Sequence, residues 1–224
     1  MNWKKKSLKL FGKLLLFMVL FHSCKQKENI RALPYYNDAT FTPNWLDVNA
    51  EQLDDFHTIA PFEFLNQDGE KITDQTLAGK IHVADFFFTS CPGICPRMTN
   101  NLSLVQDAFA LDTSVVLLSY SVTPEKDSVS VLKAYAENKG IQSGKWHLLT
   151  GQRQEIYELG RKSYFAEEDL GEPKGEDDFL HTEHFFLIDG KGHLRGIYNG
   201  LNKNSVNELI SDIATLQSEA PTKE

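Results

Sequence analysis

Cysteine is scarce in this chain of 224 residues, which contains only Cys24, Cys91 and Cys95. Three cysteines allow at most one disulfide within the chain, so a scaffold held together by several disulfides is excluded. Cys91 and Cys95 lie four residues apart. This pair predicts either a local disulfide or a site made of two thiolates.

A long apolar run is also lacking, since the longest, Leu14–Phe21, is too short to span a bilayer comfortably. Lysines precede and interrupt this region, and it ends at Ser23-Cys24, as in a secretory signal. The small residue before Cys24 resembles a bacterial lipoprotein signal, although Phe21 is less usual at its position. We therefore predict a signal peptide at residues 1–23, lipidation of Cys24 and a domain on the periplasmic side of a membrane. A plain signal peptide and an uncleaved anchor are the alternatives, and both also place the domain outside the cytoplasm.

Positive charge is in short supply, with 23 basic against 31 acidic residues and a net charge of −8. Removal of residues 1–23 takes away five lysines and no acid, which leaves 18 basic against 31 acidic residues, a net charge of −13. Nucleic-acid binding needs a basic surface, so this balance argues against a nucleic-acid partner. A metal ion or a cationic protein partner is compatible with it.

The length favours a single domain. Residues 24–54 are polar and rich in turn-forming residues, which predicts a tether. We expect the domain at residues 55–216 and a flexible tail at residues 217–224. An Asp-Gly turn within residues 62–72 predicts an N-terminal β-hairpin extension.

The remaining patterns predict an α/β fold with a central mixed sheet flanked by helices. Apolar runs predict strands, and apolar residues at three- and four-residue spacing predict helices. The expected strands cover residues 81–88, 115–120, 146–149, 184–188 and 193–198, and the expected helices cover residues 97–111, 126–138, 152–163 and 203–216.

The two cysteines stand between a buried strand and the start of a helix. Residues at i and i+4 lie one helical turn apart, so Cys91 and Cys95 can point at the same spot. The backbone amides and dipole of a helix N-terminus favour thiolate over thiol. Thiolates attack disulfides, and they are also the soft ligands that Cu(I) prefers.

The order of strand, CxxxC loop and helix resembles the thioredoxin superfamily, although redox thioredoxins have only two residues between their cysteines. Residues 55–216 more closely resemble the Sco/SenC copper chaperones of cytochrome oxidase assembly. The resemblance is carried by four segments: Phe-Thr-Ser-Cys-Pro-Gly-Ile-Cys-Pro at 88–96, Ser-Val-Thr-Pro-Glu-Lys-Asp at 121–127, Trp-His-Leu-Leu-Thr-Gly at 146–151, and His181-Thr182 before Phe-Phe-Leu-Ile-Asp at 185–189. Gly93 and Thr123 depart from the family, since many members have Asp at each position.

This resemblance implies that Cys91, Cys95 and His181 bind Cu(I) or Cu(II). It also implies that a monomeric metallochaperone, rather than an enzyme in the usual sense, delivers copper to the CuA-type site of an oxidase subunit or to another cuproprotein. His184 is the rival for His181, but side chains three residues apart on a strand face opposite sides. Two other functions stay open: a thiol:disulfide oxidoreductase that reduces copper-ligand cysteines of a partner, and a redox or copper sensor.

Two further features bear on the same chemistry. Asp85 interrupts an apolar strand six residues before Cys91, and burial would raise its pKa and make it a possible proton acceptor for the cysteine pair. A carboxylate with a purely structural role in the strand is the alternative. The acid-rich residues 167–178 predict a mobile loop that swings His181 on and off the site, or a merely solvated loop.

Overall fold

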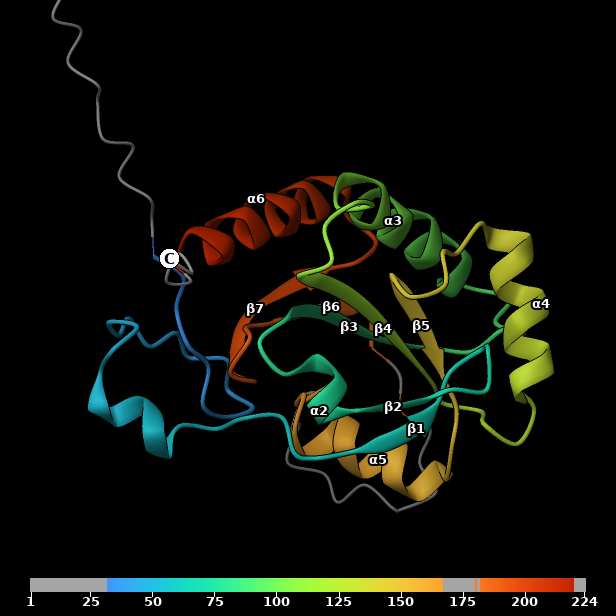
Figure 1. The fold of residues 1–224 in the computed structure, drawn as a ribbon, viewed down its shortest axis with the longest axis horizontal. Helices are drawn as coiled ribbons and strands as arrows, with labels where there is room; N and C mark the ends of the chain where they lie inside the picture. The colour runs from blue at the N-terminus through green and yellow to red at the C-terminus, as the bar shows by residue number, and fades with distance from the viewer. Residues whose placement is uncertain (1–31, 167–179, 181, 220–224) are drawn as a thin grey trace, which may run out of the picture. The chain divides into compact units, whose positions relative to one another are not determined.

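A five-stranded sheet forms the centre of the protein (Figure 1). The computed structural model describes residues 32–166, 180 and 182–219. The strand order is β5-β4-β3-β6-β7; β3, β4 and β5 run parallel, β6 pairs antiparallel with β3, and β7 pairs antiparallel with β6. The strands are β3 (Ile81–Phe87), β4 (Val115–Ser121), β5 (Trp146–Leu149), β6 (His184–Ile188) and β7 (Leu194–Asn199). The predicted mixed sheet is confirmed, with β3 in its middle.

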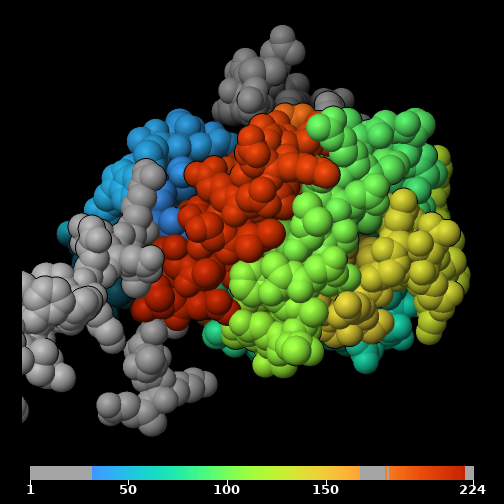
Figure 2. All heavy atoms as spheres, turned by 90° about the horizontal axis from the view of Figure 1, so that it is seen from above, coloured from blue at the N-terminus to red at the C-terminus, as the bar shows by residue number. Residues whose placement is uncertain are grey.

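Helices cover both faces of this sheet (Figure 1). On one face α3 (Cys95–Ala108) and α6 (Lys203–Glu219) lie side by side (Figure 2), and α4 (Val129–Lys139) extends that layer. The other face is covered by α5 (Arg153–Lys162), by the short α2 (Asp74–Leu77), and by a hairpin of β1 (Glu63–Leu65) and β2 (Lys71–Thr73). Within the described ranges, no helix combines the length and apolar character needed to cross a bilayer.

The apolar run of β3 is explained by its position between two cores. All seven residues of β3 are buried, and successive side chains face opposite sides of the sheet. Val83 and Phe87 pack in the core under α3 and α6, whereas Ala84 and Phe86 pack in the core under α5 and the hairpin. A central strand covered on both faces has no solvent-facing side to carry polar residues.

The predicted elements are confirmed, with small shifts at their ends. The hairpin turns where expected, because Gly69 has φ +77° and the Asn66 side-chain oxygen accepts hydrogen bonds from the amides of Asp68 and Glu70. α3 begins at Cys95, two residues before the predicted start. α4 begins at Val129 rather than at residue 126. Residues 123–127 form a turn instead, in which the amides of Lys126 and Asp127 donate hydrogen bonds to the Thr123 carbonyl.

The predicted tether is packed against the domain from residue 32 onward. Leu33, Tyr35 and Leu53 are buried, and the short 3-10 helix η2 (Glu51–Asp55) is part of this segment. The Tyr36 amide donates to the carbonyl of Leu194 at the start of β7, 3.0 Å away. A few apolar anchors therefore fix residues 32–54, although their composition is that of a linker. Of the predicted tether, only residues 24–31 lie outside the described chain.

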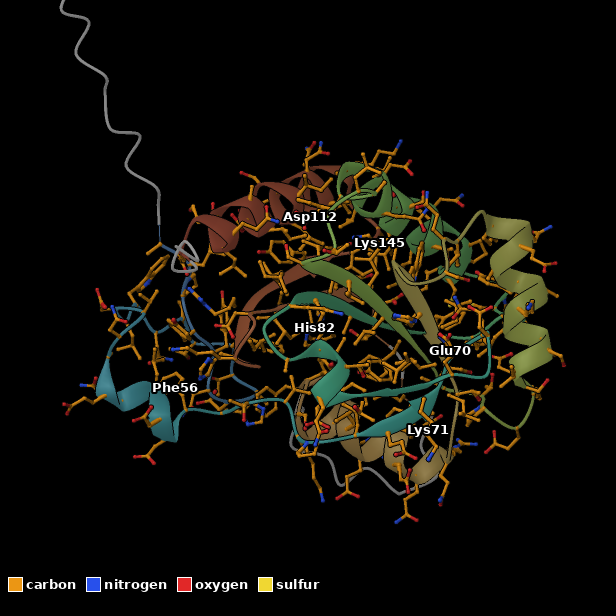
Figure 3. All side chains as sticks on the ribbon, viewed as in Figure 1. Phe56, Glu70, Lys71, His82, Asp112 and Lys145 are labelled. Carbon is orange, nitrogen blue, oxygen red and sulfur yellow. The ribbon has the colours of Figure 1, made fainter. Side chains whose placement is uncertain are left out.

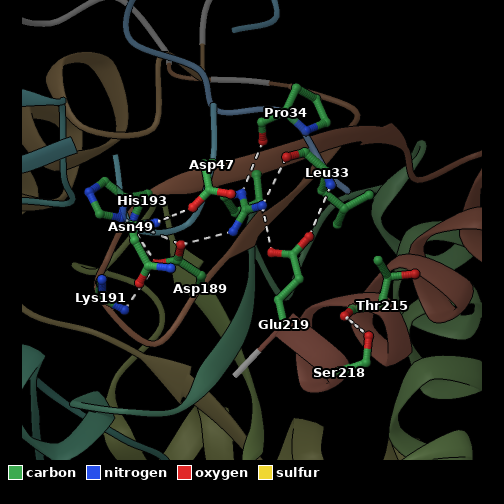
Figure 4. Close-up of polar contacts among 11 residues, drawn as sticks. Leu33, Pro34, Asp47, Asn49, Asp189, Lys191, His193, Thr215, Ser218 and Glu219 are labelled. Atoms are coloured by element: carbon green, nitrogen blue, oxygen red, sulfur yellow. Dashed lines mark hydrogen bonds and ion pairs between the residues drawn. The ribbon is translucent and has the colours of Figure 1, made fainter. Parts of the chain in front are cut away.

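Arg195 of β7 joins the two ends of the described chain through contacts with Leu33, Pro34 and Glu219, which Figure 4 labels. Its guanidinium donates to the carbonyl oxygens of Leu33 and Pro34 at 2.9 and 3.0 Å. It also pairs with Asp189 at 3.2 Å and with Glu219 at 2.8 Å. α6 therefore extends to Glu219, two residues beyond the predicted start of the flexible tail at residue 217, because its last carboxylate has a buried partner.

Candidate metal centre

The two cysteines lie at the junction of β3 and α3. β3 ends at Phe87, Cys91 follows in the loop, and Cys95 is the first residue of α3. Pro96 occupies the first turn of this helix, where the missing N–H has no helical partner to lose. Cys91 is half-buried, Cys95 is buried, and both are free thiols. They lie close enough for each thiol to shift the pKa of the other.

The two thiols differ in acidity. Burial alone would raise the pKa of Cys91, but hydrogen bonds from the Cys95 side chain and from the amides of Cys95, Gly93 and Ile94 outweigh it, so the pKa is lowered. Burial raises the pKa of Cys95. The interaction with the Cys91 thiol and the negative charges of Cys91 and Asp85 raise this pKa further. Cys91 is therefore the thiol that ionises first, and it is also the one that solvent reaches.

Asp127 fixes the start of the cysteine loop. Its fully buried carboxylate accepts hydrogen bonds from the Thr89 hydroxyl at 2.5 Å and from the Thr89 amide at 3.1 Å. The hydroxyls of Ser121 and Thr123 donate to it at 2.6 and 3.2 Å. Bonds to a charged acceptor are strong, so Asp127 ties the loop to the end of β4. Hydrophobic patterning cannot reveal this role, because it marks Asp127 only as a polar residue near a turn.

Asp85 lies in β3, below the cysteine loop, and its side chain is almost completely buried. Burial raises the pKa of Asp85 to about 7, although a hydrogen bond from the Ser119 hydroxyl acts in the opposite direction. Its charge in turn raises the pKa of Cys95. The carboxyl group can therefore change its protonation near neutral pH within electrostatic reach of the inner thiol.

The sheet brings the start of β6 to the edge where β3 gives way to the cysteine loop. β6 runs antiparallel to β3, with Ile188 opposite His82 and Phe186 opposite Ala84. The first residue of β6, His184, therefore lies toward the end of β3 from which the cysteine loop leaves. The chain enters β6 and leaves β3 at the same edge of the sheet.

The residue before His181 is firmly placed at this edge. Leu180 is fully buried, and a Cβ added to Gly160 would come within 2.7 Å of Leu180 and 2.9 Å of Phe86. Leu180 thus packs against α5 beside Phe86, near the end of β3. His181 itself lies outside the described residues, as do Cys24 and the loop at 167–178. His184, the alternative ligand to His181, is hydrogen-bonded through Nδ1 to the Thr182 hydroxyl, 3.1 Å away.

The other histidines within the described ranges have structural surroundings. His82, at the start of β3 (Figure 3), is buried 3.4 Å from the Tyr164 hydroxyl, and burial lowers its pKa to about 4. His147 lies 3.2 Å from the Asn66 amide, and burial lowers its pKa as well. Across the described residues, no group of three His, Cys, Asp or Glu side chains is arranged to hold a metal ion.

Residues 50–218 match the family model for SCO1/SenC, well over half of the chain. The chain belongs to the SCO1/SenC family. The thioredoxin-like fold agrees with this membership, since similar solved structures are Sco proteins. One is BsSco, a member of the Sco family of cytochrome c oxidase assembly proteins in which a disulfide switch was identified; it is 34% identical, with TM-score 0.62, covering 72% of this chain and 94% of BsSco.

Two other structures add what has been observed in this SCO1/SenC family. A SCO1/SenC family lipoprotein from Bacillus anthracis is 30% identical, with TM-score 0.63, covering 72% of this chain and 95% of the lipoprotein. ScoI of Arabidopsis thaliana was solved with copper bound; it is 27% identical, with TM-score 0.55, covering 69% of this chain and 96% of ScoI. Copper is thus the metal found in relatives of this protein.

The two departures from the Sco pattern have different surroundings. Gly93 is exposed, and a Cβ built on it would meet nothing within 4 Å, so the loop has room for the Asp of other members. Thr123 donates to Asp127, where an Asp would instead place a second carboxylate beside the first. The first change therefore alters the charge beside Cys91, and the second alters the support of the loop.

Proposed function

We propose that this protein is a copper metallochaperone that binds the ion through Cys91, Cys95 and His181 and delivers it to the copper subunit of a respiratory cytochrome oxidase. The observation that carries the proposal is a pair of free, neighbouring thiols at the end of the sheet where β6 begins. Two relatives support it, one a cytochrome c oxidase assembly protein and the other a copper-bound Sco protein.

The chemistry of the donor set suits a copper ion of either charge. Two thiolates match Cu(I), and an added imidazole nitrogen helps to accommodate Cu(II). Thiolate formation begins at Cys91, because its surrounding amides favour the charged form. Cys95 ionises reluctantly on its own, so the positive charge of the ion must offset its raised pKa.

Anaerobic copper titration of the reduced protein tests this proposal. We expect one copper per chain for the wild type, and a visible thiolate-to-Cu(II) absorption band that is lost in His181→Ala and in Cys91→Ser. His184→Ala is the matched control, because this neighbouring imidazole is three residues away and is expected to leave the band unchanged. A band that survives His181→Ala but disappears in His184→Ala would identify His184, and not His181, as the third copper ligand.

A thiol:disulfide oxidoreductase is the second candidate, and the unequal acidity of the thiols favours it. A half-exposed thiol with a lowered pKa can attack a partner's disulfide, and a buried neighbour can then resolve the mixed disulfide. The disulfide switch of BsSco points the same way. Turnover of a disulfide substrate that is equal in wild type and His181→Ala, without stoichiometric copper binding, would make reduction the main activity.

The place of action follows from the N-terminal sequence. We propose lipidation at Cys24 and a periplasmic, membrane-attached protein, in keeping with the lipoprotein of Bacillus anthracis. Cys24→Ser should move the protein from the membrane fraction to the soluble periplasmic fraction without changing copper binding. A Cys24→Ser protein that stays with the membrane would indicate an uncleaved N-terminal segment instead.

A further inference from the structure

A small cavity lies beside the start of β3, whereas the two thiols follow the end of this strand. Its volume is about 220 Å³, less than the roughly 300–1,000 Å³ of pockets that bind drug-sized ligands. The walls come from α2, from the turn between β6 and β7, and from the segment that leads into β1. The apolar residues of the lining are Ile59, Phe62, Leu77 and Ala78. The cavity therefore suits a small molecule with an apolar body.

Backbone contacts hold the walls of this cavity in place. The Ile59 amide donates to the Gly192 carbonyl at 2.9 Å, and the Gly79 amide donates to the Gly190 carbonyl at 3.0 Å. A Cβ on Gly190 would come within 2.9 Å of the Gly79 backbone, so a side chain there would push the two segments apart. The turn between β6 and β7 is thus fixed on both sides, and the cavity is preformed.

His82 lines the cavity and has one unpaired ring nitrogen. It is the second residue of β3 and is only 4% exposed (Figure 3). Its Nε2 lies 3.4 Å from the Tyr164 hydroxyl, whereas its Nδ1 is buried and has no hydrogen-bond partner among the described residues. Buried polar atoms are nearly always hydrogen-bonded, so an unpaired one beside a cavity indicates a partner that the cavity holds.

The charges around His82 favour a neutral partner. Burial disfavours the imidazolium and lowers the pKa of His82 to about 4, so a positive charge at this depth is costly. An anion is disfavoured by the carboxylate of Asp189, which also lines the cavity and acts electrostatically on His82. Asp74 and Lys191 line the cavity with opposite charges, so together they favour neither sign.

We propose that this cavity is a binding site for a small neutral molecule with an apolar body and one hydroxyl group, a phenol or a short alcohol, whose hydroxyl pairs with His82 Nδ1. A neutral imidazole has one N–H and one acceptor nitrogen, and a hydroxyl both donates and accepts, so it fits either tautomer. The apolar walls, with Phe62 among them, contact the rest of the molecule. The site goes beyond the proposed copper chemistry, because it uses none of the proposed copper ligands.

Titration of the protein with phenol, followed by NMR of the imidazole nitrogens, tests the proposal. We expect saturable binding that shifts the His82 Nδ1 resonance and leaves that of His147, whose Nδ1 already has a partner in Asn66. Toluene lacks the hydroxyl and should bind at least about tenfold more weakly, because it leaves Nδ1 unpaired. Tighter binding of the cationic benzylamine or the anionic benzoate would overturn the proposed ligand class. A phenol titration without saturation would show that water alone meets Nδ1.

Two variants test whether the phenol binds in this cavity. His82→Phe keeps a planar ring without Nδ1 and should weaken phenol binding by at least about tenfold. Ala78→Phe fills the cavity from an exposed position without replacing His82, so it carries the test if His82→Phe fails to fold. Ala108→Phe, at an exposed alanine of α3 outside the cavity, is the matched control. Equal phenol affinity in wild type and Ala78→Phe would overturn the proposal, whereas His181→Ala tests copper binding alone and should leave phenol binding unchanged.

Discussion

At the scale of single residues, the site is built on two buried carboxylates with opposite tasks. Asp127 is surrounded by donors and holds the loop in place, whereas Asp85 accepts one hydrogen bond from the Ser119 hydroxyl and has a raised pKa. The sequence draws attention to Asp85, because an acid stands out in an apolar strand. Hydrophobic patterning gives no such signal for Asp127, whose neighbours are polar, and only the resemblance of residues 121–127 to the Sco pattern includes it.

Replacement of Asp127 by Asn should weaken the support of the cysteine loop. The amide cannot accept all the bonds that the carboxylate accepts from Thr89, Ser121 and Thr123, so we expect a loss of about 1–3 kcal/mol in the free energy of unfolding. Urea denaturation measures this loss. Glu125→Gln, an exposed change in the same turn, is the control. Equal midpoints for the two variants would contradict the role of Asp127.

Replacement of Asp85 by Asn should change how stability depends on pH. The folded pKa of Asp85 is raised to about 7, against about 3.9 in an unfolded chain. The folded protein then binds the extra proton between about pH 4 and pH 7, so this group lowers the free energy of unfolding as pH rises through that window. Asp85→Asn should be more stable than wild type at about pH 7.5, by on the order of 1–4 kcal/mol, and equally stable near about pH 4.

Urea denaturation at a series of pH values checks this expectation. The exposed Asp54→Asn controls for the loss of one negative charge. Parallel curves for wild type and Asp85→Asn would show that burial does not shift the titration of Asp85.

At the scale of elements, periodic segments were predictable and the segment at 32–54 was not. Strands such as β3 and β5 can be predicted from their apolar runs, because both of their faces are covered. Residues 32–54 instead owe their position to isolated anchors such as Tyr35, and to contacts with β7 that are distant in sequence. No local pattern encodes a partner more than a hundred residues away, and for the same reason the sequence alone could not reveal the contacts of Arg195.

Arg195→Met should release this N-terminal segment. The substitution leaves Asp189 and Glu219, both largely buried, without their common cation, which typically costs about 3–5 kcal/mol. We expect lower stability in urea and faster hydrogen exchange of the Leu33 and Tyr36 amides. Lys71→Met breaks an exposed ion pair with Glu63 and is the control, expected to change little. Unaltered exchange at Leu33 in Arg195→Met would rule out this role of the ion pairs.

We predict from the sequence that movement of the acid-rich residues 167–178 brings His181 to the site and takes it away. If copper fixes His181, hydrogen exchange across residues 167–178 should fall on copper loading and rise again on its removal. The His181→Ala protein is the control, in which added copper should leave this exchange unchanged. Exchange that is insensitive to copper in the wild type would favour a merely solvated loop.

At the scale of the whole molecule, copper is expected to stabilise the fold. The proposed ligands precede β6 and follow β3, so a bound ion would link two segments that are about 90 residues apart in the sequence. Binding to the folded state alone raises stability by about 2.7 kcal/mol at a free copper concentration 100 times the dissociation constant. The melting temperature should rise with copper in wild type and not in a Cys91→Ser, Cys95→Ser double variant. An equal rise in both proteins would indicate binding elsewhere.

The hydrogen bonds of Arg195 to Leu33 and Pro34 lie at the opposite end of the sheet from the two thiols. Leu194 pairs with Ile188, which pairs with His82, so the chain is held at the end of the sheet where β3 starts, and the cysteines lie beyond the other end. Residue 32, the first described residue, therefore belongs to a segment that packs at the end of the sheet without the thiols. The length of β3, about 23 Å for its seven residues, separates the contacts of Arg195 from the thiols. If the protein hands over copper as proposed, the recipient would have to reach the end of the sheet that lies opposite the N-terminal segment.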